Sequence, residues 1–141
     1  MIVEMVERFL DTNIMLRHFL NDDPVMSPAC RALIQAIEQG RETVWTTDLA
    51  IAEVVFVLSS KRRYNIPREM IRDNLLAVIN LPGLKLPNKR IYARVFHLYT
   101  MLPIDFIDAY HAALMESRGA HELYSYDHDF DRIPGLTRHE P

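Results

Sequence analysis

Near its amino terminus the chain reads Val6-Glu7-Arg8-Phe9-Leu10-Asp11-Thr12-Asn13. Val6 to Leu10 predicts a short buried strand, and Asp11 to Asn13 are residues typical of a turn and a helix cap. The apolar pattern of Ile14 to Leu20 then predicts a helix. The chain thus opens with a strand that ends on an acid and passes directly into a helix, which is the first half of a β-α-β unit.

The same alternation continues along the chain. Further short strands are predicted at residues 43–46, 84–86, 122–125 and 136–139, and further helices at residues 28–38, 48–58, 67–80, 88–100 and 105–118. Strands that alternate with helices indicate β-α-β units and a mostly parallel sheet of four to five strands. The 141 residues fit one domain, so we expect an α/β fold in a single domain that spans residues 1–141.

Four carboxylates lie in apolar stretches of this sequence, and they are Asp11, Glu53, Asp108 and Asp127. A charged carboxylate in an apolar setting is costly unless a partner compensates it. Few cations lie close by in the sequence, so we expect the four acids to converge on a metal ion. In a parallel sheet the functional groups lie beyond the carboxyl ends of the strands, which are the positions of Asp11 and Asp127.

Each acid also has a structural alternative. Asp11 is suited to capping the helix that follows it, and Asp105 to capping the helix that contains Asp108. Asp108 would then lie in a first helical turn, where the helix dipole favours an acid. Asp127 and Asp129 are typical turn residues.

Glu53 fits these alternatives least, because it lies in the middle of a predicted helix. Its same-face neighbours include Leu49 and Phe56, so the remaining alternative is a buried salt bridge. Asp105 and Asp108 lie three residues apart, where a helix brings like charges together. A site made only of carboxylates suits Mg²⁺ or Mn²⁺ rather than zinc.

Bulk composition restricts the surroundings of this chain. The sequence has one cysteine, which allows no intramolecular disulfide and fits a reducing compartment. No apolar run approaches the roughly 18 residues of a membrane helix, and the amino terminus carries acids where a signal peptide carries Lys or Arg. We therefore expect a cytoplasmic protein without a membrane segment.

The net charge of −3 conceals a basic middle. Residues 61–94 contain nine Lys or Arg and two acids. A basic region beside an acidic cleft would hold nucleic-acid phosphates, although solvated helix faces are an equally good explanation. The candidate RNA contacts are Lys61, Arg62, Arg63, Arg68, Lys89 and Arg90.

Four motifs together resemble the PIN domain, and more narrowly the single-domain VapC-type toxins of toxin–antitoxin pairs. Phe9-Leu10-Asp11-Thr12-Asn13 resembles the opening strand and first acid, and Ile51-Ala52-Glu53-Val54-Val55 the helical acid. Asp105-Phe106-Ile107-Asp108-Ala109-Tyr110-His111-Ala112-Ala113 resembles the third acidic segment. The residues from Leu123 to Leu136 resemble the carboxyl-terminal motif, with Ser125 where the family commonly has Thr.

This resemblance implies a three-layer fold, with a parallel sheet flanked by helices, and a Mg²⁺-dependent endoribonuclease for which Mn²⁺ is an alternative metal. It also implies a homodimer and a small VapB-like antitoxin as partner. Asp11, Glu53, Asp108 and Asp127 would be the catalytic metal ligands. Asn13 and Ser125 would orient those ligands, and Asp105 and Asp129 would add charge.

Three rival functions remain open at this point. A PIN-like module could bind RNA without cleaving it, although a binder has no use for acids beside phosphates. A free-standing PIN nuclease would have the same site and no antitoxin. A haloacid dehalogenase type phosphatase also begins with a strand that ends on Asp, but that family has a second Asp where this chain has Asn13.

Overall fold

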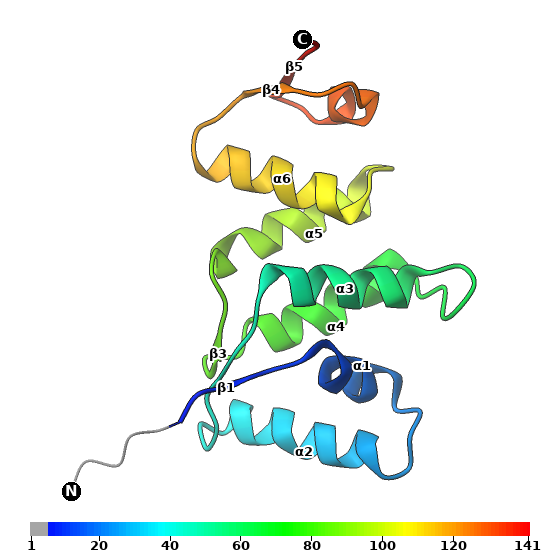
Figure 1. The fold of residues 1–141 in the computed structure, drawn as a ribbon, viewed down its shortest axis with the longest axis vertical. Helices are drawn as coiled ribbons and strands as arrows, with labels where there is room; N and C mark the ends of the chain where they lie inside the picture. The colour runs from blue at the N-terminus through cyan, green and yellow to red at the C-terminus, as the bar shows by residue number, and fades with distance from the viewer. Residues whose placement is uncertain (1–5) are drawn as a thin grey trace, which may run out of the picture. The chain divides into compact units, whose positions relative to one another are not determined.

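The computed structural model describes residues 6–141, which fold as two compact units divided after Lys89 (Figure 1). The first unit contains strands β1 (Arg8–Phe9), β2 (Val44–Trp45) and β3 (Leu84–Lys85). Its helices are α1 (Thr12–Leu20), α2 (Met26–Glu38), α3 (Asp48–Ser59) and α4 (Arg68–Ile79). Strands and helices alternate as the sequence predicted.

The three strands of the first unit form a parallel sheet in the order β1-β2-β3. Val44 and Leu84 are partners in register and are both buried, whereas Phe9, Trp45 and Lys85 form the next row and are exposed. Val44 and Leu84 therefore face the core of the unit, and the row of Phe9, Trp45 and Lys85 faces away from it. The weak strand signal at residues 84–86 is confirmed as β3.

Strand β1 differs from its prediction as a buried strand. Both of its residues are exposed, and the buried position is Leu10, which follows the strand and is only 2% exposed. Strand β1 lies at one edge of the three-stranded sheet and pairs with β2 alone. Leu10 is anchored to β2, because its amide donates to the carbonyl of Trp45 at 2.7 Å.

The helices of the first unit pack in pairs. Helix α1 contacts α2 and α3, and α3 contacts α4 (Figure 1). Helix α3 begins as predicted, because the Thr47 hydroxyl accepts a hydrogen bond from the amide of Ala50 at 3.2 Å. Helix α2 ends before Gly40, whose φ of +76° suits glycine.

The second unit begins at Arg90, in the short 3-10 helix η1 (Lys89–Ile91) that spans the boundary. It contains helices α5 (Tyr92–Met101) and α6 (Phe106–Ser117), which pack against each other. Strands β4 (Glu122–Tyr124) and β5 (Thr137–His139) form a parallel pair. The connection between them includes a second 3-10 helix, η2 (His128–Arg132).

The predicted α/β class, with short parallel strands and flanking helices, is confirmed. The five strands of the described part of the chain are divided between a three-stranded sheet and a two-stranded sheet. Among residues 6–141, no helix combines the length and apolar character needed to cross a bilayer.

Helix α4 offers a direct test of the core of the first unit. Leu75 is fully buried, so Leu75→Ala removes apolar contacts and leaves a cavity, and we expect a loss of about 2–5 kcal/mol in the free energy of unfolding. Met70 lies on the same helix and is 52% exposed, so Met70→Ala is the matched control and should change stability by less than about 1 kcal/mol. Urea unfolding followed by circular dichroism measures both variants, and equal losses would contradict this packing.

Candidate metal centre

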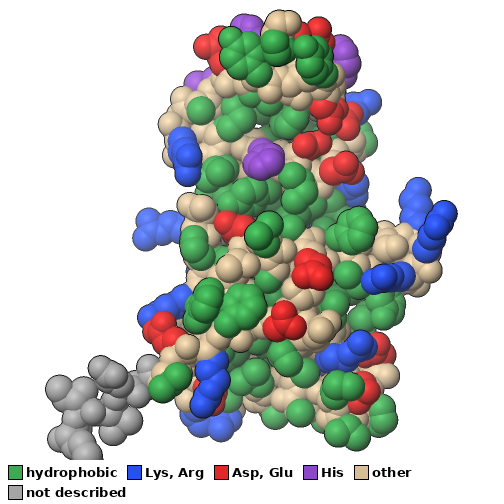
Figure 2. Space-filling view, viewed as in Figure 1, with side chains coloured by type: hydrophobic (Ala, Val, Ile, Leu, Met, Phe, Trp, Pro, Cys, Tyr) green, Lys and Arg blue, Asp and Glu red, His purple; other side chains and the backbone are tan. Residues whose placement is uncertain are grey.

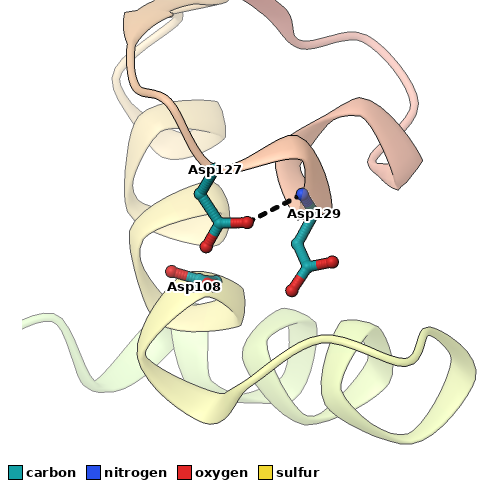
Figure 3. Close-up of side chains that lie close together, drawn as sticks. All are labelled: Asp108, Asp127 and Asp129. Atoms are coloured by element: carbon teal, nitrogen blue, oxygen red, sulfur yellow. Dashed lines mark hydrogen bonds between the residues drawn. The ribbon is translucent and has the colours of Figure 1, made fainter.

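Three carboxylates of the second unit come together in one cluster. One oxygen each from Asp108, Asp127 and Asp129 lie within 4.8 Å of one another (Figure 3). Asp108 and Asp129 are half-buried and Asp127 is exposed. Three like charges at this spacing repel one another, and a cation among them would remove the repulsion.

The local fold explains why these acids meet. Asp108 lies in the first turn of α6, and Asp127 follows the carboxyl end of β4. Parallel strands require a crossover connection, and here the crossover from β4 to β5 carries both Asp127 and Asp129. Buried Phe130 and Ile133 anchor that crossover to the core of the unit.

Hydrogen bonds fix the backbone around Asp127. The Ser125 hydroxyl accepts from the amide of Asp127 at 2.9 Å, and the Asp127 carboxylate accepts from the amide of Asp129 at 2.9 Å. Asp127 therefore forms a turn, as its residue type predicts. Its second carboxylate oxygen points toward Asp108 (Figure 3). Asp129 also forms an ion pair with Arg132.

The environment of Asp108 disfavours its charged form. Burial, which strips water from the carboxylate, is the largest cause that raises the pKa of Asp108, and the nearby charges of Asp127, Asp105 and Asp129 raise it further. The charge of His111 acts in the opposite direction. Asp105 holds the N-cap position of α6 and its side chain makes no capping hydrogen bond, so it contributes charge near the cluster.

In the first unit, Asp11 is exposed and holds the N-cap position of α1. Its side chain makes no capping hydrogen bond, which argues against capping as its role. The backbone just before it is firmly held, because the buried Thr46 hydroxyl donates to the Leu10 carbonyl at 2.9 Å. This bond positions the end of β1 and therefore the start of Asp11.

Glu53 projects from the middle of α3, and Thr12 is its partner. The Thr12 hydroxyl donates to Glu53 Oε2 at 3.0 Å, and Thr12 itself is only 5% exposed. This bond joins the first residue of α1 to α3, and it places Glu53 beside the residue that follows Asp11. A hydroxyl donor to one oxygen leaves the second carboxylate oxygen of Glu53 to serve as a ligand.

The expected apolar surroundings of these acids need correction. Glu53 is exposed, and its neighbours Leu49 and Phe56 are 82% and 74% exposed. Asp11 and Asp127 are exposed as well. Leu49 and Phe56 share the face of Glu53, and that face is exposed because α3 buries its other sides through Ile51, Val54, Val55 and Leu58. Asp108 is half-buried, and burial raises its pKa.

Asn13 and the candidate RNA contacts were also predicted from sequence. Asn13 is exposed on α1 and lines a pocket of about 420 Å³ with residues of α1 and α2. Lys61, Arg62 and Arg63 lie exposed in the turn after α3, and Figure 2 shows Lys and Arg side chains projecting from this turn.

The other basic candidates differ from these three. Arg68 begins α4 and is half-buried, and Arg90 is exposed in η1. The Lys89 ammonium donates to the carbonyls of Leu81 and Leu84 at 2.7 and 2.8 Å, and burial lowers the pKa of Lys89. The ammonium of Lys89 therefore holds the turn before β3.

Two features of the site were missed from sequence. Asp129, which the sequence predicts only to add charge, belongs to the same carboxylate cluster as Asp127. Thr12 was treated only as a turn residue, although it is the hydrogen-bond donor to Glu53. Glu53 lies 41 residues from Thr12 in the sequence, so no local pattern could identify it as the partner of the Thr12 hydroxyl.

Comparison with known families identifies the fold. A family model of the PIN domain matches residues 8–136, so the chain belongs to the PIN domain family. A search of curated proteins found no match. Among solved structures, the chain is similar to the VapC20 toxin of Mycobacterium tuberculosis, which is described as cleaving the sarcin-ricin loop. The identity is 14%, the TM-score is 0.39, and the match covers 92% of this chain and 97% of that one.

The raised pKa of Asp108 predicts a pH-dependent effect on stability in protein freed of metal by EDTA. A folded-state pKa above the unfolded value means that ionised Asp108 lowers the free energy of unfolding, and that this loss disappears as Asp108 is protonated. We therefore expect Asp108→Asn to be more stable than the wild type at pH 7. The difference should vanish near pH 4, about where an unperturbed Asp titrates.

Urea unfolding of the two proteins at both pH values measures this difference. An equal difference at pH 7 and pH 4 would show that the substitution acts through packing and not through the charge of Asp108. A less stable Asp108→Asn at pH 7 would contradict the repulsion inferred for the cluster.

Proposed function

We propose that this protein is a divalent-metal-dependent endoribonuclease. The observation that carries the proposal is the cluster of Asp108, Asp127 and Asp129, with ligand oxygens within 4.8 Å of one another. Membership of the PIN domain family supports a nuclease built on this cluster. RNA as the substrate, rather than DNA, follows from the resemblance of the four acidic motifs to those of VapC-type toxins.

The donor set fits a hard divalent cation. All three clustered ligands are carboxylates, and neither His nor Cys belongs to the group. Such a set favours Mg²⁺ in the cell, with Mn²⁺ as an alternative, and disfavours zinc. The raised pKa of Asp108 points the same way, because a cation would favour the ionised form that the neighbouring acids oppose.

Asp11 and Glu53 are proposed as further ligands of the same site. Both acids belong to the family-matched region and to motifs that resemble those of VapC-type toxins, and both are exposed. Neither carboxylate is accounted for by helix capping, since Asp11 makes no capping bond and Glu53 lies in mid-helix.

The chain's own residues would hold and orient the ligands. Thr12 donates to Glu53 and so fixes which carboxylate oxygen is free, and Ser125 fixes the backbone of Asp127. When bound, the cation supplies positive charge for the scissile phosphate and lowers the pKa of water at the site. Asp105 adds negative charge that strengthens cation binding.

The exposed turn after α3 is proposed to hold the RNA backbone. Lys61, Arg62 and Arg63 are consecutive and exposed there. Such contacts add affinity without choosing the sequence. Arg68, Lys89 and Arg90 are weaker candidates, and the ammonium of Lys89 would have to leave two backbone carbonyls to reach a phosphate.

We further propose that the protein is the toxin of a VapBC-type pair. In this proposal residues 1–141 act as one cytoplasmic domain, form a homodimer and are inhibited by a VapB-like antitoxin. These properties rest on the resemblance of the acidic motifs. The principal alternative is a PIN-like module that binds RNA without cleaving it, and the second is a nuclease without an antitoxin.

Cleavage of RNA by the purified protein tests this function. We expect discrete fragments with Mg²⁺ or Mn²⁺ and none with EDTA. Asp11→Asn and Asp127→Asn should each lower the rate by at least about 100-fold, since even residues that only support metal ligands cost 10–100-fold. Asp11→Asn should leave the fold intact, because the Asp11 side chain is exposed and caps nothing.

Asp73→Asn is the matched control, because Asp73 is an exposed acid on α4 that pairs with Arg72. Its rate should equal that of the wild type. RNA binding without cleavage under either metal would support the non-catalytic module, and full activity of Asp11→Asn would remove Asp11 from the mechanism.

A further inference from the structure

We infer that Arg138 is a positioning residue that fixes the metal-binding segment between Ser125 and Asp131. This inference rests on the proposed metal site and deepens it. Arg138 lies outside every acidic motif identified from sequence, and its hydrogen bonds and ion pairs within residues 6–141 go to Ser125, His128, Asp131 and Glu140. Its role would be to hold the turn that carries two of the clustered carboxylates.

The side chain of Arg138 binds both ends of that turn. At the beginning, its Nη1 donates to the carbonyl of Ser125 at 2.9 Å, two residues before Asp127. At the far end, its Nε and Nη2 donate to the two carboxylate oxygens of Asp131 at 3.1 and 3.3 Å, two residues after Asp129. The guanidinium thus spans the segment that contains both metal-cluster acids.

The remaining contacts hold the guanidinium itself. Arg138 Nη1 also donates to Glu140 at 2.8 Å, and Nη2 lies 3.0 Å from Nδ1 of His128. The Arg138 side chain is only 11% exposed, whereas Asp131 and Glu140 are about half exposed. A planar guanidinium with several fixed donors is suited to this geometry, and a lysine ammonium cannot reproduce the bidentate contact with Asp131.

The backbone of Arg138 is fixed independently of these contacts. Arg138 lies in β5, where it is the register partner of Leu123 in β4. The amide of Ser125 donates to the carbonyl of His139 at 3.0 Å, which continues the pairing past the end of β4. The Arg138 side chain therefore extends from a paired strand, and its contacts hold the turn in place relative to the β4–β5 pair.

The charge of Arg138 makes the test decisive. Arg138→Gln removes a positive charge near an acidic cluster, so electrostatics alone predicts tighter cation binding. The positioning role of Arg138 predicts weaker cation binding, because without its contacts the turn no longer holds Asp127 and Asp129 close to Asp108. We expect the affinity for Mn²⁺ to fall by about 10–100-fold, which is the usual cost of losing a residue that orients metal ligands.

The experiment measures Mn²⁺ affinity of the full chain by electron paramagnetic resonance of free Mn²⁺. Arg138→Lys, which keeps the charge, should also bind more weakly than the wild type. Asp131→Asn should weaken binding too, and the double variant should lose less than the sum of the single losses, because both substitutions break one contact. Arg94→Gln is the matched control, since Arg94 pairs with Glu116 at 3.0 Å in the same unit and does not touch the turn.

Amide hydrogen exchange of the variants provides a readout that is independent of metal. In Arg138→Gln the amides of Asp127 and Asp129 should exchange faster, while those of α6 stay protected as in the wild type. Unchanged or tighter Mn²⁺ binding by a folded Arg138→Gln, with the wild type binding Mn²⁺ normally, would overturn the role of Arg138 alone. Failure of the wild type to bind Mn²⁺ would overturn both this inference and the proposed metal site.

Discussion

Repulsion among the clustered carboxylates is the constraint on which this account depends. Asp108, Asp127 and Asp129 present oxygens within 4.8 Å of one another. Burial is the largest cause that raises the pKa of Asp108, and the charges of the neighbouring acids raise it further. The fold maintains this arrangement through hydrogen bonds and ion pairs to Ser125, Arg132 and Arg138 around the turn. The cation that we propose for this cluster would remove the repulsion among the three carboxylates.

The backbone before Asp11 and the backbone before Asp127 are held in similar ways in the two units. In each unit an acid follows the end of a short parallel strand, and a side chain from another segment binds the backbone between the strand and the acid. Thr46 binds the carbonyl of Leu10 before Asp11, and Arg138 binds the carbonyl of Ser125 before Asp127. The strands position the backbone before each acid, and these two hydrogen bonds limit its movement. The proposed metal site would need such preorganised ligands.

Much of this arrangement could be predicted from local sequence. The strand before Asp11, the start of the helix at residue 48 and the strand at residues 84–86 all follow from short-range patterns, and the structure contains each of them. The surroundings of Glu53 could not be predicted, because periodicity shows which residues share a face and not whether that face is covered. The bonds of Thr12 to Glu53 and of Arg138 to Asp131 depend on how the elements pack and on strand register, which no local pattern contains.

The most direct test of the account is a titration of substoichiometric Mn²⁺ into ¹⁵N-labelled protein, followed by paramagnetic broadening of amide signals, with Mg²⁺ as the diamagnetic control. The account predicts that the signals of Asp108, Asp127 and Asp129 disappear first, together with those of Asp11 and Glu53. Broadening confined to residues of the second unit would contradict the proposal that Asp11 and Glu53 are ligands of the same metal. Uniform weak broadening over the surface would contradict a specific metal centre altogether.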